Sequence, residues 1–157
     1  MSSRASERTR MGIEKSGSAG AADRPAPRLP APLLARARRA RRVVEVGAGA
    51  RFDVALALAR ASPQAEWWVT DVDPRVLAAP APLRAALLDA HAPTGDWSGT
   101  DLVYAMRVPE ELQGAVLAFA RSLGADAALR PLKDEWADAG PRRALVWPDG
   151  WRYFPIE

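Results

Sequence analysis

Five short apolar segments alternate with helical patterns between residues 43 and 129, and this alternation limits the fold more than any other feature of the chain. Helices are predicted over 52–61, over 74–79 and, most strongly, between Pro109 and Gly124. The predicted strands cover residues 43–46, 67–70, 85–88, 102–106 and 127–129. Strands that alternate with helices form a parallel sheet covered on both faces. We therefore predict an α/β fold with a doubly wound, mostly parallel sheet.

A β-hairpin is predicted at the end of this pattern. Residues 143–147 and 151–154 are apolar and aromatic, and they flank the turn sequence Pro148-Asp149-Gly150. The hairpin would add an antiparallel edge to the sheet.

The N-terminal region differs from the rest in composition. Residues 1–42 hold 11 of the 22 Lys and Arg residues and three of the 19 acidic residues, a net charge of +8, while residues 43–157 carry −5. Residues 1–32 contain few large apolar side chains, so we predict a disordered basic tail, followed by a folded domain over 33–157 that opens with a lead-in helix over 33–42. The basic segment could bind RNA, DNA or an acidic partner, or it could simply be solvated, which is typical of charge runs without aromatic residues.

Composition excludes several classes of function. The chain has no cysteine, which excludes disulfides, thiolate metal sites and cysteine nucleophiles. A single histidine, His91, makes a histidine-rich metal centre untenable, and no metal is predicted. No apolar run is long enough to span a membrane, and the N-terminus has no signal-peptide pattern, so we predict a cytoplasmic protein that does not bind membranes.

The segment from Val43 to Phe52 reads VVEVGAGARF, an apolar strand that leads through Gly47-Ala-Gly49 into a helix. The first glycine permits a tight turn, and the second lets a ligand approach the backbone. A dinucleotide site requires Gly or Ala where this chain has Phe52. Glu45 at the end of the strand would repel a phosphate and attract a cation. The loop therefore favours a cationic ligand over a pyrophosphate.

Two further acids follow the next two strands. Asp71 ends the second strand, 22 residues after the second glycine of the loop, and Asp89 follows the third. Each acid has an alternative role: Glu45 could pair with Arg51 or with an arginine of the tail, Asp71 could cap the helix at Pro74, and Asp89 could cap a loop. Because open α/β sheets bind ligands at the carboxyl ends of their strands, we predict that the three acids together line a nucleoside-type site.

These motifs resemble those of Rossmann-type S-adenosylmethionine-dependent methyltransferases, whose first motif reads E/D-x-G-x-G. The resemblance implies a Rossmann-like domain and S-adenosylmethionine as cofactor. It also implies that Asp71 holds the ribose hydroxyls and that Asp89 contacts the adenine. The implied cofactor-binding residues are Glu45, Gly47, Gly49, Asp71 and Asp89.

More narrowly, residues 36–155 are similar to a small, uncharacterised and mainly archaeal family of methyltransferase-like proteins. The similarity lies in R-F-D after the glycine loop, D-V-x-P-R, D-L-V-Y-x-x-R-x-P-E-E-L-Q and a late L-R-P-L. It implies the fold, but no established reaction.

Arg107 and Arg130 directly follow the fourth and fifth strands. They could neutralise the acids, or they could clamp an anionic substrate, since the guanidinium fork matches phosphate and carboxylate groups. In the strand order 3-2-1-4-5 we expect both on the acceptor side of the site, away from the positively charged cofactor. His91 is interpreted as a surface loop residue rather than a base.

The sequence therefore predicts an S-adenosylmethionine-binding, methyltransferase-like protein whose acceptor, an anionic small molecule or macromolecule, and whose catalytic residues are not specified. The fourth strand lacks the Asn/Asp-Pro-Pro-Tyr motif of amino-methyltransferases, and cysteine-dependent pyrimidine methylation is excluded. Two alternatives remain open at this point: a non-catalytic Rossmann-type module that binds a nucleoside or a protein, and an RNA-associated protein that uses its basic tail.

Overall fold

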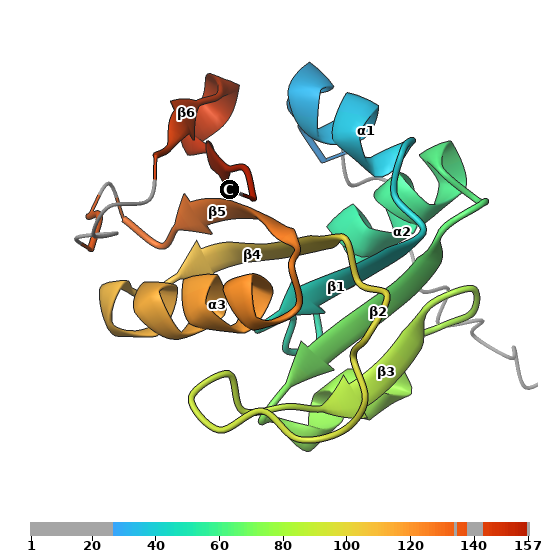
Figure 1. The fold of residues 1–157 in the computed structure, drawn as a ribbon. Helices are drawn as coiled ribbons and strands as arrows, with labels where there is room; N and C mark the ends of the chain where they lie inside the picture. Colours follow the sequence, from blue (N-terminus) through green and yellow to red (C-terminus); the bar gives the residue numbers. More distant parts are fainter. Residues whose placement is uncertain (1–26, 134, 138–142, 157) are drawn as a thin grey trace, which may run out of the picture.

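The computed structural model describes residues 27–133, 135–137 and 143–156. They form one seven-stranded sheet in the order β3-β2-β1-β4-β5-β7-β6 (Figure 1). The first five strands are parallel, whereas β7 is antiparallel to both β5 and β6. The strands are β1 (Arg42–Val46), β2 (Glu66–Asp71), β3 (Arg84–Leu87), β4 (Leu102–Val108), β5 (Asp126–Pro131), β6 (Leu145–Val146) and β7 (Arg152–Phe154). The predicted α/β class, its parallel sheet and its C-terminal antiparallel hairpin are confirmed.

Helices cover both faces of the sheet. The helices are α1 (Ala31–Ala37), α2 (Asp53–Ala61) and α3 (Glu110–Ser122), with short 3-10 helices η1 (Pro74–Ala78) and η2 (Pro148–Gly150). Alternate residues of β1 point to opposite faces, so Val43 packs with α1 and α2 while Val44 packs with α3. This double cover explains why the strand sequences are almost continuously apolar.

The lead-in helix is shorter than predicted. Helix α1 begins at Ala31 and ends at Ala37, whereas the sequence predicts a helix over 33–42. It ends early because Arg42 already belongs to β1, where it is paired with Glu66 of β2. Most of the predicted tail, residues 1–26, lies outside the described residues.

Helix α3 follows the predicted pattern closely. Pro109 precedes it, and Glu110 and Glu111 lie in its first turn, where the helix dipole favours negative charge. Its buried face, which includes Val116 and Phe119, packs against β4 and β5. Gly124 follows the helix with a φ of 66° and lets the chain turn into β5.

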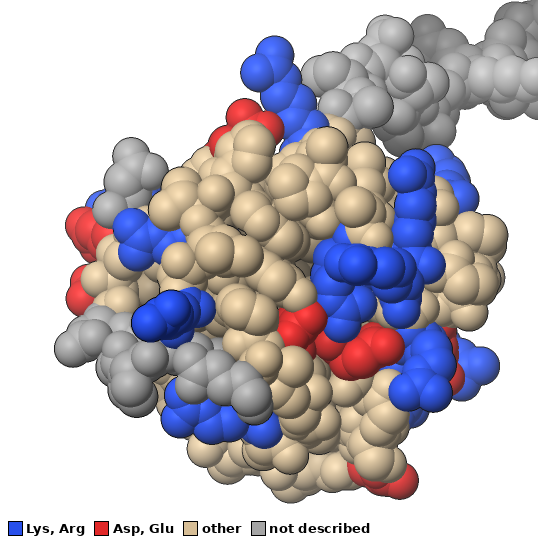
Figure 2. Space-filling view, turned by 45° about the horizontal axis from the view of Figure 1, so that its top comes forward, with Lys and Arg blue, Asp and Glu red and all other residues tan. Residues whose placement is uncertain are grey.

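Charge is mixed over the surface. Figure 2 shows basic side chains in several separate groups on this face, with acidic side chains beside some of them. Among the described residues, no helix has both the length and the apolar character that a membrane crossing requires.

Candidate functional site

The glycine loop follows β1 and is held against β2. The backbone N–H groups of Gly47 and Ala48 both donate to the carbonyl oxygen of Thr70, at 2.8 and 3.0 Å. Gly47 and Gly49 have φ values of 79° and 58°, a region that residues with a side chain rarely adopt. A Cβ atom on Gly47 would meet no atom within 4 Å, so the space beside the loop is open.

Glu45 is the most unusual residue of this region. It is only 3% exposed, and its Oε2 atom has no hydrogen-bond partner among the described residues. Burial, together with the nearby carboxylates of Asp53 and Asp71, raises the pKa of Glu45 to about 8. No ion pair with Arg51 forms among the described residues, so the structure does not support that alternative. Glu45 is thus a buried carboxyl group whose Oε2 atom lacks a partner among the described residues.

A cleft of about 430 Å³ opens beside Glu45 and the glycine loop, and we call it the loop cleft. Its lining includes Glu45, Gly47, Gly49, Arg51, Asp53 and Arg107. Three predicted cofactor residues therefore meet in one cavity. Arg107 lies there as well, although the sequence places it on the acceptor side alone.

Asp71 lies next to the loop at the end of β2. Its Oδ2 atom accepts a hydrogen bond of 2.6 Å from the backbone N–H of Gly49, and its Oδ1 atom accepts one of 3.0 Å from that of Asp73. Asp73 rather than Asp71 caps η1, because its carboxylate accepts from the backbone N–H of Arg75. Each oxygen of Asp71 keeps a second lone pair that a ligand hydroxyl could use.

Asp89 is not among the residues that line the loop cleft. It is exposed, and its Oδ1 atom accepts a hydrogen bond of 2.9 Å from the backbone N–H of His91, which is exposed as well. The preceding residue, Leu88, donates its N–H to the carbonyl oxygen of Asp71, so Asp89 follows β3 at the same edge of the sheet. In this structure Asp89 stabilises its own loop, and its contact with adenine remains a prediction.

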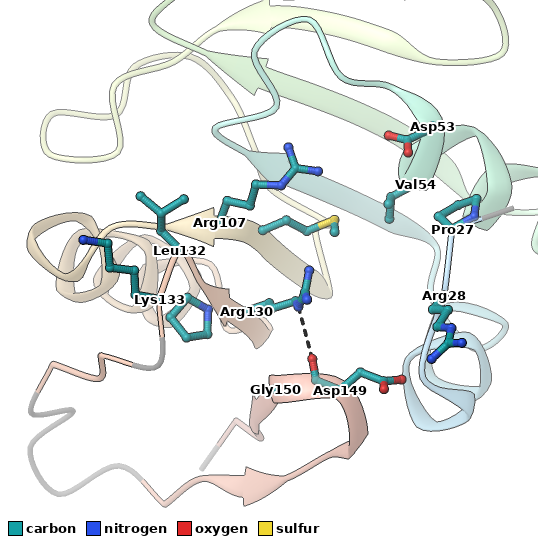
Figure 3. A pocket seen from close by; sticks show the side chains of 12 residues that line it. Pro27, Arg28, Asp53, Val54, Arg107, Arg130, Leu132, Lys133, Asp149 and Gly150 are labelled. Carbon is teal, nitrogen blue, oxygen red and sulfur yellow. Dashed lines mark hydrogen bonds between the residues drawn. The ribbon is translucent and has the colours of Figure 1, made fainter. Parts of the chain in front are cut away.

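A second cleft of about 700 Å³ adjoins the first, and we call it the arginine cleft (Figure 3). It brings together the two predicted substrate residues, Arg107 and Arg130. The Nε atom of Arg130 donates to the carbonyl oxygen of Asp149 at 3.1 Å. The two clefts share Asp53, Val54, Met106 and Arg107, so a ligand in one would approach a ligand in the other at this wall.

The backbone of Arg107 has a φ of 48°, which places a long side chain in the left-handed region. The register between β4 and β5 shifts between Met106 and Val108, so Arg107 lies at an irregularity of the strand. Such bulges redirect a side chain and are common beside functional sites. The irregularity explains how Arg107 comes to line both clefts.

We expect Arg107→Gly to be more stable than Arg107→Ala by about 1 kcal/mol, because both lose the guanidinium group but only glycine is free of strain at this φ. Urea denaturation of both variants measures the difference. The same pair at Arg121 in α3 is the control, where alanine should be the more stable by a similar amount. Equal stabilities at position 107 would contradict a strained backbone.

Sequence reasoning missed one residue of the site, Asp53, and a buried hydroxyl group on the strand next to Glu45, that of Tyr104. Asp53 begins α2 and lines both clefts, and its place directly after the glycine loop is a signal that could have identified it.

Tyr104 lies opposite Glu45 in the β1–β4 register and is fully buried, with no partner for its hydroxyl among the described residues. Burial raises the pKa of Tyr104 well above its usual value. No sequence signal marks this hydroxyl, because an apolar strand with one tyrosine is common.

The fold is similar to that of known methyltransferases. A methyltransferase from Aquifex aeolicus, described as S-adenosylmethionine-dependent, matches with a TM-score of 0.58 and 16% identity, over 80% of this chain and 88% of that chain. PigF, solved with S-adenosylhomocysteine, matches with a TM-score of 0.55 and 14% identity, over 79% of this chain and 60% of its own. Other similar methyltransferases are longer, and this chain spans about a third of them (33% and 34% in two cases). The matches to the Aquifex aeolicus methyltransferase and to PigF confirm a Rossmann-like, methyltransferase-like fold.

Sequence relatives identify the family. A protein from Halobacterium salinarum, described as a UPF0146 protein, is 41% identical over 95 residues, which are 60% of this chain and 70% of the relative. The family model described as "Uncharacterised protein family (UPF0146)" matches residues 29–146. The glycine loop, Glu45 and the arginines near the ends of β4 and β5 lie within this match, and the chain belongs to the UPF0146 family.

Proposed function

We propose that this protein binds S-adenosylmethionine in the loop cleft and transfers its methyl group to an acceptor. The observation that carries the proposal is the buried Oε2 atom of Glu45, which has no partner among the described residues and borders the glycine loop. A buried carboxylate without a partner is costly, by several kcal/mol for a charged group. The ammonium group of the cofactor's methionine end would supply that partner.

Other residues of the site fit the rest of the cofactor. The methionine carboxylate needs a cation, and Arg51 lines the same cleft as Glu45. Asp71, hydrogen-bonded to the loop, is suited to accept from the ribose hydroxyls. Asp89, which follows the next strand, is proposed to contact the adenine after a rearrangement of its loop.

Bound S-adenosylmethionine supplies an electrophilic methyl group: an acceptor lone pair forms the new bond to it, sulfur retains the electron pair of the broken bond, and the acceptor proton passes to water. The chain's own contribution would be to hold donor and acceptor together, which can account for a large part of the rate acceleration of such a reaction. The shared wall of the two clefts is where such an approach could take place. The similarity to methyltransferase folds supports this proposal.

Calorimetric titration of the full chain with S-adenosylmethionine, S-adenosylhomocysteine and NAD tests the cofactor. We expect saturable binding of the first two and none of NAD, because Phe52 and Glu45 oppose a pyrophosphate. Binding of NAD alone would overturn the assignment. Binding of both S-adenosyl compounds without methyl transfer to any acceptor in a lysate screen would identify a non-catalytic module.

We expect Asp71→Asn to weaken S-adenosylhomocysteine binding by about 5- to 100-fold, roughly 1–3 kcal/mol, because the amide has one oxygen fewer to accept from the ribose. Asparagine keeps an oxygen for the N–H of Gly49, which holds the glycine loop, and loses only the hydrogen bond that Asp71 Oδ1 accepts from the N–H of Asp73. Asp96→Asn is the control, because Asp96 is an exposed acid outside the loop cleft whose carboxylate accepts hydrogen bonds from Ser98. Unchanged affinity in Asp71→Asn would exclude Asp71 from the cofactor site.

A further inference from the structure

The geometry points to the arginine cleft as the binding site for a small organic acceptor that carries a phosphate or carboxylate group, held by Arg107 and Arg130. This inference rests on the proposed function, because it names the substrate class of that methyl transfer. It is carried by the charge, the spare hydrogen-bonding capacity and the size of the cleft.

Cations outnumber acids in the cleft. Four basic residues line it, Arg28, Arg107, Arg130 and Lys133, against two acids, Asp53 and Asp149. None of the four forms an ion pair with a described residue, whereas Arg36, Arg42, Arg75 and Arg84 elsewhere in the fold all do. The cleft therefore carries an excess of positive charge that no ion pair with a described residue neutralises, and this charge would attract an anion.

The absence of ion pairs also decides between the two roles that the sequence left open. Neutralisation of Glu45, Asp71 or Asp89 would place a guanidinium group against one of these acids, and no such pair exists among the described residues. Arg130 uses only its Nε atom, towards the carbonyl oxygen of Asp149. Its two terminal nitrogens make no hydrogen bond to a described residue and present the fork that suits an oxyanion.

The side chains are held around a common space. Arg107 and Arg130 come from the ends of the neighbouring strands β4 and β5, and Arg28 comes from the segment before α1 on the other side (Figure 3). Lys133 points away from the other three in this view. The hydrogen bond to Asp149 holds Arg130, and the irregular backbone at Met106–Val108 directs Arg107. Side chains fixed in this way lose little entropy when they bind an anion.

The cleft is larger than an inorganic ion needs. Its volume of about 700 Å³ is typical of sites for small organic molecules, and Pro27, Val54, Met106 and Leu132 add apolar surface. Residues 43–157, which supply most of the lining, carry a net charge of −5, so the positive charge of the cleft is local within this part of the chain.

The cleft also lies where an acceptor is needed. Its wall of Asp53, Val54, Met106 and Arg107 is shared with the loop cleft that we assign to the methyl donor. An acceptor anchored by its anionic end at Arg130 would direct its other end towards this wall. Anchoring away from the reacting atom is how remote binding energy can position a substrate.

Calorimetric titration of the full chain at low salt with phenyl phosphate, benzoate and uncharged benzyl alcohol tests the inference, and the two anions distinguish phosphate from carboxylate. We expect at least one anion to bind saturably, and benzyl alcohol to bind at least tenfold more weakly. Arg107→Ala and Arg130→Ala should each weaken anion binding by about 10- to 100-fold. Arg130→Lys should have an intermediate effect, and Arg121→Ala, the control on α3, should have none.

Absence of anion binding, or an equal loss in Arg121→Ala, would overturn the inference. Displacement of phenyl phosphate by a lower concentration of single-stranded RNA would also overturn it, in favour of a macromolecular anion. Titration with S-adenosylhomocysteine keeps the two proposals apart, since Arg130 does not line the loop cleft and Arg130→Ala should bind it normally. If neither the wild type nor any variant binds S-adenosylhomocysteine, but anion binding still depends on Arg130, the proposed function fails and the anion site stands.

Discussion

Replacement of Glu45 by glutamine is expected to make the protein more stable, by an amount that grows with pH. The side chain is buried, its Oε2 atom has no partner in the part of the chain that the structure describes, and its pKa of about 8 lies far above the ordinary value of 4.5. Glutamine has nearly the same shape and never ionises. The variant should therefore match the wild type where Glu45 is protonated and exceed it where Glu45 must ionise inside the protein.

Proton linkage determines the direction in which this stability difference changes with pH. Between pH 4.5 and about 8 the folded state keeps a proton on Glu45 that the unfolded state has released, so the stability contributed by this group is lost as the pH rises. Over an interval from pH 5.5 to 8.5, the advantage of Glu45→Gln should grow by about 3 kcal/mol. Urea denaturation of both proteins at several pH values measures it, and the other titrating groups cancel in the difference.

Glu66→Gln is the control, because the pKa of Glu66 is shifted in the opposite direction from that of Glu45. Hydrogen bonding to Trp68, and further interactions with Arg42 and Arg84, lower the pKa of Glu66. A carboxyl group with a lowered pKa contributes its full stabilisation at every pH above its pKa in the unfolded state. The free energy of unfolding that Glu66→Gln loses should therefore stay constant from pH 5.5 to 8.5. A constant difference for Glu45→Gln as well would show that Glu45 is ionised throughout and has a partner in solution.

The fold could be predicted because its determinants are local. The strands of the sheet are short apolar runs, and α3 combines Pro109, two acids in its first turn and a closing glycine. The strand order came from the resemblance to methyltransferases rather than from any pattern in the chain. The predicted end of α1 was wrong because the sequence near Ala37 contains no signal that ends a helix. We attribute the end of the helix to the pairing of Arg42 with β2, which the local sequence does not show.

The site could be predicted only in part, for a related reason. Residues that follow parallel strands meet at one edge of a sheet, and this brought Glu45 and the glycines beside Arg107. The direction in which a side chain points at the end of its strand depends on tertiary contacts, which the local sequence does not show. The carboxylate of Asp89 accepts a hydrogen bond within its own loop, as many Asp residues do. The left-handed backbone of Arg107 could not be predicted either, because arginine has no preference for that conformation.

Binding of S-adenosylhomocysteine should strengthen steeply with pH if Glu45 receives the ligand's ammonium group. In the free protein Glu45 is mostly protonated below pH 8, and only its ionised form attracts a cation. Affinity should therefore rise by up to about tenfold per pH unit below 8 and level off above it, until the ammonium group itself begins to titrate. Calorimetry in two buffers of different ionisation enthalpy should also detect about one proton released per ligand near neutral pH.

Two variants test the origin of this pH dependence. Glu45→Gln should bind the ligand at least tenfold more weakly at pH 8 and lose most of the slope, because no carboxylate remains to ionise. Asp53→Asn should keep the slope but shift the rise to lower pH, since the Asp53 carboxylate helps to raise the pKa of Glu45. Tyr104 titrates well above this range and cannot produce the effect. Tight binding with no pH dependence in the wild type would show that the ammonium group lies elsewhere, and the partner of Glu45 would then have to be sought outside the cofactor.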